Sequence, residues 1–169
     1  MALKVNQLNS SNRYEITDTE QGYQFITETG VIYFINFITY PPVSELFPVR
    51  IYMFNIDRFV PENLLYKGSV GNKVRNTVIH ILEVFFYSSE EALITICDID
   101  DGRQKIRKRL FDTWFNLFNK GRLYRLDTEC LVDGCITYAS LYFRRTSYDK
   151  ELWKEEFKKL AEIQFYNDL

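Results

Sequence analysis

The amino-acid sequence predicts a single α+β domain in which three helices accompany a curved, mostly antiparallel sheet of about six to seven strands. Three observations support this prediction. Strand-like segments dominate the first third of the chain, helical spacing of apolar residues appears only after residue 72, and the first connections are too short for crossovers. The predicted order is ββββαβαββα, and residues 1–169 are expected to form one globular domain with a polar lead-in at 1–12.

Four strands are expected before the first helix. Alternating or continuous apolar residues place them at residues 13–17, 23–28, 31–40 and 47–56. The third strand is apolar at nearly every position, so both of its faces should be covered. Gly30 stands between the second and third strands and is expected to supply the positive φ of a hairpin turn.

The second half of the chain alternates helices with strands. Helices are expected at residues 73–87, 103–120 and 148–167, and strands at 92–97, 123–128 and 135–144. A helix leads into strand 92–97, so this strand can pair in parallel with a neighbour. We expect the helices to pack on one face of the sheet. His80, the single histidine, falls on the polar side of its helix and is expected to be solvated.

Charge is distributed unevenly along the chain. The net charge is −2, but residues 103–125 contain eight Lys and Arg residues and one acid, which gives this segment +7 and the remainder −9. A basic element on an acidic body suits phosphate, a nucleic acid or an acidic partner. It equally suits the protein's own acidic surface. The candidate nucleic-acid surface of this segment consists of Lys105, Lys108, Arg109, Arg122 and Arg125.

The cysteines and the N-terminus bear on cellular location. The cysteines are odd in number, no secretory signal is visible, and no apolar run reaches about 18 residues. We therefore expect a reduced, cytoplasmic protein without a membrane partner. Cys130 and Cys135 are separated by four residues and lie far from the single histidine. This is poor zinc spacing, so neither a metal nor a cofactor is expected.

The helix at 103–120 begins in an unusual way. Five of its first seven residues are Lys or Arg, whereas helix starts normally favour acids because their free N–H groups carry partial positive charge. With Ile106 set at 0°, Arg103 falls at about 60° and Arg107 at about 100°. Both lie within the apolar arc, which is formed by Ile106, Leu110, Phe111, Trp114, Leu117 and Phe118. Outside this arc, and expected to be solvated, are Lys105, Lys108 and Arg109.

An unpaired buried guanidinium is costly, so Arg103 and Arg107 must either meet acids or line a wet cleft. In the first alternative, Asp98 or Asp100 pairs with Arg103 or Arg107 and holds the strand–helix corner together. In the second, a cleft presents the arginines to an anionic ligand. In the third, the acids hold a divalent cation and an arginine stabilises the transition state. The candidate ligand-binding residues are Arg75, Asp98, Asp100, Asp101, Arg103 and Arg107.

Three segments carry a family-like pattern. The central one consists of Cys97-Asp98, Asp101-Gly102-Arg103-Gln104, Arg107, Arg109-Leu110-Phe111 and Trp114-Phe115. The other two are Tyr23-x-Phe25-x-Thr27-x2-Gly30-x2-Tyr33 and Asn72-x2-Arg75-x-Thr77-x-Ile79. These residues resemble an uncharacterised bacterial family, a domain of unknown function seen mainly in the Bacteroidetes group. The resemblance covers residues 14–145 and implies a bacterial cytoplasmic protein, but it implies no activity and transfers no functional residue.

The chain shows no P-loop, dinucleotide-binding glycine pattern, nucleophile elbow or zinc signature. No catalytic residue is assigned, and we expect a non-catalytic binding or protein-interaction module built around the Arg/Asp corner, with a protein or an anionic ligand as partner. The alternative is a nucleic-acid-binding protein or a metal-dependent phosphate-processing enzyme that uses the same corner. Convergence of Asp98, Asp100 and Asp101 on one open site favours the enzyme. Because Arg107 is expected to face inward, Arg107→Ala should destabilise the fold more than Lys108→Ala, by roughly 1–3 kcal/mol.

Overall fold

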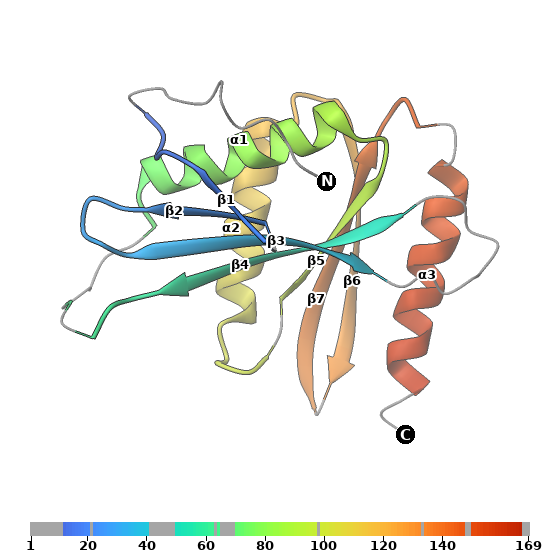
Figure 1. Ribbon diagram of the computed structural model, residues 1–169. Helices are drawn as coiled ribbons and strands as arrows, with labels where there is room; N and C mark the ends of the chain where they lie inside the picture. Colours follow the sequence, from blue (N-terminus) through green and yellow to red (C-terminus); the bar gives the residue numbers. More distant parts are fainter. Residues whose placement is uncertain are drawn as a thin grey trace. The chain divides into compact units, whose positions relative to one another are not determined.

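Over the residues that it describes, the computed structural model shows a seven-stranded, mixed and unclosed sheet with three helices (Figure 1). The described residues are 12–20, 22–40, 50–62, 64, 70–97, 99–132, 134–147 and 150–166, without the side chains of 132 and 160–166. The strands are β1 (Thr17–Thr19), β2 (Gly22–Ile26), β3 (Ile32–Tyr40), β4 (Ile51–Phe59), β5 (Ala92–Cys97), β6 (Leu123–Val132) and β7 (Cys135–Arg144). The helices are α1 (Asn72–Ser88), α2 (Gln104–Phe118) and α3 (Lys150–Tyr166). The predicted α+β class and order of elements are confirmed.

The strands neighbour one another in the order β1-β2-β3-β4-β5-β7-β6. The pairs β1–β2, β2–β3, β5–β7 and β6–β7 are antiparallel. Strands β4 and β5 are parallel, with Ile51 opposite Ala92. Helix α1 lies between these two strands in the chain and provides the crossover that a parallel pair requires. The expectation that strand 92–97 pairs in parallel is therefore confirmed.

The chain divides into two compact units. The first contains the described residues up to Ile38 together with Phe54–Ser89, and the second contains those of Thr39–Met53 and Glu90–Leu169. Strands β3 and β4 each run through both units. The expectation that residues 1–169 form one globular domain stays a prediction.

In the first unit, α1 packs its apolar stripe onto an aromatic core. The predicted stripe is buried throughout and consists of Val74, Val78, Ile81, Leu82 and Phe85. Phe85 stacks on Phe37 of β3 with 4.9 Å between ring centres. Gly30 has φ +82, as the predicted turn between β2 and β3 requires.

The segment before β1 contacts α1. The backbone N–H of Tyr14 donates to Thr77 Oγ1 at 2.9 Å, and residues 14–16 belong to no strand. The predicted strand 13–17 is therefore wrong apart from Thr17, the first residue of β1. A side-chain acceptor on the helix has taken the place of a strand partner for this backbone.

His80 on α1 is also placed differently from the prediction. Its side chain is only 18% exposed, and its Nδ1 lies 3.8 Å from Glu83 Oε2. Burial, with a smaller contribution from Arg13, lowers the pKa of this imidazole. The prediction that His80 is solvated is therefore wrong. Its side chain is half-buried because the segment that contains Arg13 runs beside α1.

In the second unit, α2 and α3 cover opposite faces of the sheet (Figure 1). Tyr142 of β7 contacts Phe115 of α2 at 5.3 Å between ring centres. Its neighbour Phe143 contacts Trp153 of α3 at 6.4 Å. Successive residues of a strand point to opposite faces. The expectation that the helices share one face is therefore wrong.

The edge of the sheet in this unit is a long hairpin. Strands β6 and β7 pair from Leu123 opposite Arg144 to Val132 opposite Cys135. Strand β6 extends beyond the predicted 123–128 because Cys130 and Thr137, which face each other, are both buried and continue the core. No described helix is long and apolar enough to cross a membrane.

Candidate functional site

The strand–helix corner after β5 is held together by one carboxylate. Asp101 Oδ1 accepts a hydrogen bond from the backbone N–H of Arg103 at 3.0 Å and lies 2.8 Å from Arg107 Nη1. Gly102, with φ +68, turns the chain between them and donates to the carbonyl of Ile99. The bond from Arg103, followed by the pairing with Arg107, lowers the pKa of Asp101. Asp101 therefore fixes both the start of α2 and the arginine one turn into it.

The other predicted acids do not complete a metal site in the described part of the chain. Asp98 lies outside the described residues, and Asp100 is exposed in the turn. Among the described residues, which leave out Asp98, no group of three His, Cys, Asp or Glu side chains can hold a metal ion. The first alternative assigned the pairing to Asp98 or Asp100, whereas the acid that pairs with Arg107 in the structure is Asp101.

Helix α2 is rotated relative to the prediction. Its buried residues are Phe111, Trp114, Phe115 and Phe118. On the same helical wheel this face runs from about 80° to about 180°, roughly 60° away from the predicted one. Ile106 and Leu117, which were assigned to the core, are 64% and 50% exposed. Aromatic side chains bury more apolar area than Ile or Leu, and the four aromatics decide which face turns inward.

The rotation separates the two arginines that were expected to point inward. Arg107 is partly buried, with 28% of its side chain exposed. Arg103 is exposed and precedes the helix with φ −103 and ψ 13. An angle computed for an ideal helix does not apply to such a residue, and its predicted inward position is wrong.

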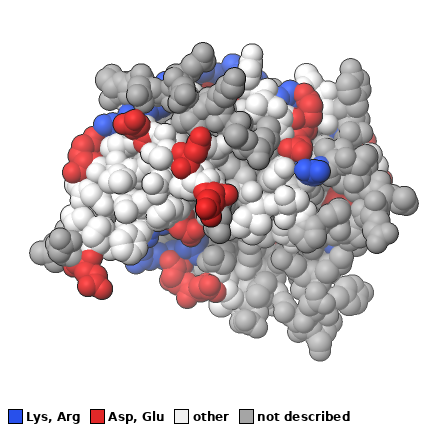
Figure 2. Space-filling model, in the orientation of Figure 1, with Lys and Arg blue, Asp and Glu red and all other residues white. Residues whose placement is uncertain are grey.

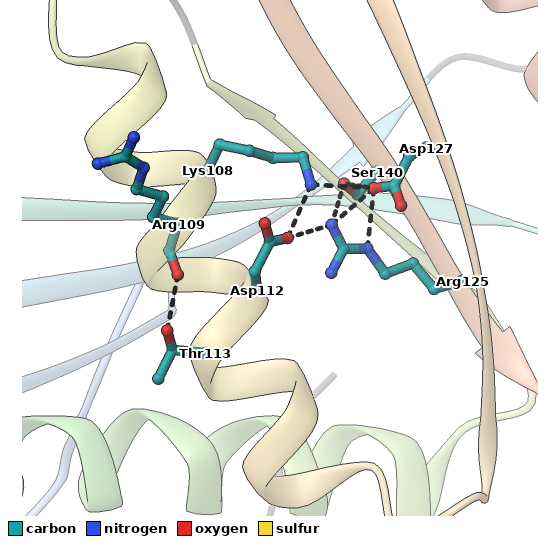
Figure 3. A network of polar contacts seen from close by, with 7 residues as sticks. All are labelled: Lys108, Arg109, Asp112, Thr113, Arg125, Asp127 and Ser140. Atoms are coloured by element: carbon teal, nitrogen blue, oxygen red, sulfur yellow. Dashed lines mark hydrogen bonds and ion pairs between the residues drawn. The ribbon is translucent and has the colours of Figure 1, made fainter.

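The same rotation brings Lys108 to the sheet and creates a polar cluster that sequence reasoning missed. This α2–β6 network consists of Lys108, Asp112, Arg125, Asp127 and Ser140 (Figure 3). Lys108 Nζ lies 2.7 Å from Asp112 Oδ1 and 3.5 Å from Asp127 Oδ1, and its side chain is only 19% exposed. The expected solvated position of Lys108 is therefore wrong.

Arg125 is the centre of this network. Its guanidinium contacts Asp112, and its Nε donates to Asp127 Oδ1 at 2.8 Å. The guanidinium also lies over the rings of Phe115 and Tyr142, at 5.4 and 5.7 Å. Only 11% of the arginine side chain is exposed. Because Arg125 is enclosed in this way, it is not a freely accessible cation.

The charges of the α2–β6 network balance. Two cations face two carboxylates, and Ser140 Oγ donates to Asp127 Oδ1 at 2.5 Å. Partial burial opposes ionisation of Asp112, but the hydrogen bonds from Lys108 and Arg125 outweigh it and lower the pKa of Asp112. Burial raises the pKa of the Tyr142 hydroxyl beneath the network. Such an arrangement holds a helix on a sheet and leaves little charge for a ligand.

The remaining predicted residues lie apart from this network. Lys105 and Arg109 are exposed on α2, and Arg122 is exposed just before β6. Figure 3 shows Arg109 pointing away from the network. Arg75 lies on α1 in the first unit, where its guanidinium donates to Asn76 Oδ1 at 3.3 and 3.4 Å. The predicted nucleic-acid residues therefore divide into two that are engaged in the network and three that are exposed.

An outer face of α2 follows from these positions. It consists of Lys105, Ile106, Arg109, half-buried Leu110 and Leu117, together with Arg103 just before the helix. No ion pair joins Lys105 or Arg109 to an acid within the described ranges. The sequence contains a signal for this face: apolar residues span about half of the α2 wheel, wider than one buried stripe of about 100°, so some of them had to face outward.

The surface charge in view is divided into small groups. Figure 2 shows one face of the molecule, where Lys and Arg side chains form separate small groups interspersed with Asp and Glu. A long duplex is normally bound by a continuous basic field. The described residues of the face in view do not present such a field.

Comparison with known families gives a match over the second half of the chain. The model of a family described as "Family of unknown function (DUF6169)" matches residues 71–159, slightly more than half of the chain. The matched range contains α1, the strand–helix corner, the α2–β6 network and the outer face of α2. No curated protein and no solved structure matches the chain.

Proposed function

Because the chain belongs to the family of unknown function DUF6169, we propose a function from the geometry of its second unit. The protein is a non-catalytic binding module that engages an acidic protein segment through the outer face of α2. The matched family range includes this whole face.

The observation that carries the proposal is an exposed apolar stripe with cations beside it. Ile106 and Leu117 are 64% and 50% exposed, and half-buried Leu110 lies between them on nearly the same side of the helix. Single exposed apolar residues are common on protein surfaces. Apolar residues along one side of a helix are the anchors with which an amphipathic helix docks on a partner.

The chemistry of this surface indicates an acidic partner with apolar side chains. Arg103, Lys105 and Arg109 lie within one turn of Ile106 and are exposed. Covering a side chain of this size contributes about 1–2 kcal/mol, while rim cations speed association and select for carboxylates. Phosphates of a nucleic acid satisfy the cations but give the apolar stripe no partner.

The state of the strand–helix corner supports a binding role over a catalytic one. Asp101 is bonded to the backbone of Arg103 and paired with Arg107. The carboxylates of the α2–β6 network are likewise paired with Lys108 and Arg125. A metal-dependent enzyme requires carboxylates that are free to take a cation.

Selection from a random peptide library tests this proposal. A displayed library of peptides of about 16 residues, long enough to cover one helix face, is selected on the wild-type protein. We expect enrichment of sequences in which Asp or Glu neighbours a bulky apolar residue. Binding of the enriched peptides is then measured by fluorescence anisotropy.

The variants Ile106→Ser and Arg109→Glu should each weaken binding about tenfold, which corresponds to about 1.4 kcal/mol. Matched controls are Leu152→Ser and Lys158→Glu, exposed residues of the same types on α3. These controls should bind as the wild type does. The proposal is wrong if no sequence is enriched, or if the enriched peptides bind Ile106→Ser and Arg109→Glu unchanged.

We also propose that the protein works in a bacterial cytoplasm. The family resemblance supports a bacterial source, and the three cysteines support a reducing compartment, since none of them forms a disulfide. Fractionation of a native host by antibody detection tests this. Recovery in the periplasmic or secreted fraction would contradict it.

A further inference from the structure

We propose that a second surface of this protein, at the open end of the β6–β7 hairpin, binds a short single-stranded segment of nucleic acid. The surface consists of Lys120, Arg122, Tyr124 and Arg145, and is called the hairpin-end surface below. It shares no residue with the outer face of α2, so the two proposals stand or fall separately.

The backbone fixes this surface. Arg145 donates its N–H to the carbonyl of Arg122 at 2.9 Å, which places the two arginines side by side at the hairpin end. Asn119 holds the preceding turn: its carbonyl accepts from Arg122 N–H at 2.8 Å and its Oδ1 accepts from Leu123 N–H at 2.7 Å. Lys120 and Arg122 therefore lie in a hydrogen-bonded turn, and Arg145 lies beside Arg122.

Arg145 offers a platform for a base. Its Cζ lies over the Tyr124 ring, 4.3 Å from the ring centre. Tyr124 is itself half-buried against Phe143, at 5.7 Å between ring centres. Arg145 is exposed, so this side chain is accessible to a ligand. Unpaired bases stack on planar arginine groups as well as on aromatic rings.

The charge around Arg145 is entirely positive in sequence. Residues 119–125 and 143–147 contain five cations and no acid. Two of the cations are engaged: Arg125 in the α2–β6 network and Arg144 with Glu90. The other three are exposed, and within the described part of the chain no ion pair engages them. Three such cations suit a stretch of about three phosphates.

Two observations favour a nucleic acid over other polyanions. The platform on Tyr124 is useful only to a ligand that has a flat ring to stack. No large exposed apolar residue occurs among the described residues of 119–125 and 143–147, so an anionic membrane would find no side chain to insert there. Bases are free to stack only in a single strand.

Fluorescence anisotropy with a labelled, mixed-sequence RNA of about 12 nucleotides tests the proposal at about 50 mM salt. We expect Arg145→Ala and Arg122→Ala to weaken binding about tenfold each, and Lys158→Ala, on α3, to leave it unchanged. Urea melts of the same variants establish that each is folded.

A second measurement isolates stacking. The wild type should bind the RNA several-fold more tightly than an abasic strand of the same length, and Arg145→Lys should abolish this difference while it keeps the charge. The proposal is overturned if no binding occurs at low salt, or if Lys158→Ala weakens binding as much as Arg145→Ala. It is also overturned if the abasic strand binds as well as the RNA, or if vesicles containing phosphatidylserine bind through Arg145 and the RNA does not.

Discussion

Arg125 of β6 and Asp112 of α2 form an ion pair that fastens the helix to the edge strand of the sheet. The guanidinium is nearly enclosed, since Asp127 lies beside it and the rings of Phe115 and Tyr142 lie beneath it. The two carboxylates are more exposed, at 36% and 47% of their side chains. The pair therefore lies between a surface salt bridge and a buried one, and its stability contribution should be intermediate.

Arg125→Ala should lower the free energy of unfolding by about 1–3 kcal/mol, less than the cost of breaking a fully buried pair. The loss arises because Asp112 and Asp127 keep their charges without the guanidinium between them, and because the ring contacts are lost. Urea unfolding measures it. Arg122→Ala, an exposed arginine nearby in sequence, should change stability by less than about 0.5 kcal/mol. Equal effects of the two variants would contradict a central role for Arg125.

The order of two further variants should reverse relative to the sequence-based expectation. Lys108 is 19% exposed and lies close to two carboxylates, whereas Arg107 is 28% exposed and pairs with an acid that is half exposed. Lys108→Ala should therefore cost at least as much stability as Arg107→Ala, with each loss about 0.5–1.5 kcal/mol. Urea melts of the two variants side by side decide the order. A clearly larger loss for Arg107→Ala would restore the original expectation.

The elements of this fold could be predicted because their signals are local. Strand β5 is a run of apolar and β-branched residues, and the buried residues of α1 follow helical spacing along one side of the helix. The faces of α2 could not be predicted in the same way. Its apolar residues span about half of the wheel, and the four aromatics, with Phe115 packed against Tyr142, turn one side of that arc inward.

Local sequence patterns also could not predict which segments distant in the sequence pack against each other. His80 is covered because the segment with Arg13 and Tyr14 runs beside α1, more than 60 residues away in sequence. The sequence did contain a signal that both faces of β7 are covered. Leu141, Tyr142 and Phe143 are consecutive and all buried, and a strand that is apolar on both faces requires cover on both.

Acid should weaken the first unit through Glu28. Lys73 Nζ donates a hydrogen bond to the Glu28 carboxylate at 2.5 Å, and the Tyr14 hydroxyl donates a second one. The bond from Lys73 has the larger effect, and together the two bonds lower the pKa of Glu28 from 4.5 to about 2. A lowered folded-state pKa means that the stabilisation is complete above pH 4.5 and is lost as the pH falls toward about 2. Urea midpoints measured across this range should fall more steeply for the wild type than for Glu28→Gln.

Glu15→Gln is the matched control for this pH dependence. Glu15 is exposed, and no ion pair engages it within the described residues. Its variant should follow the wild-type curve. The role assigned to Glu28 is wrong if Glu28→Gln retains the full wild-type slope between pH 4.5 and about 2.

Gly22→Ala should be among the most damaging single substitutions in the first unit. Gly22 has φ +154 and lies opposite Asn36 in the β2–β3 pair, and a Cβ atom there would stand 2.1 Å from the carbonyl oxygen of Ile35. The obstacle is a backbone atom, so no side-chain rotation relieves it, and we expect the free energy of unfolding measured in urea to fall by at least about 2 kcal/mol.

Gly71→Ala is the control, because a Cβ at Gly71 meets nothing within 4 Å. Its cost should stay below about 1 kcal/mol, the range for loss of a glycine before a helix. If Gly22→Ala cost as little as Gly71→Ala, the prediction would be wrong, and β2 and β3 would be able to separate by the small distance that a methyl group requires.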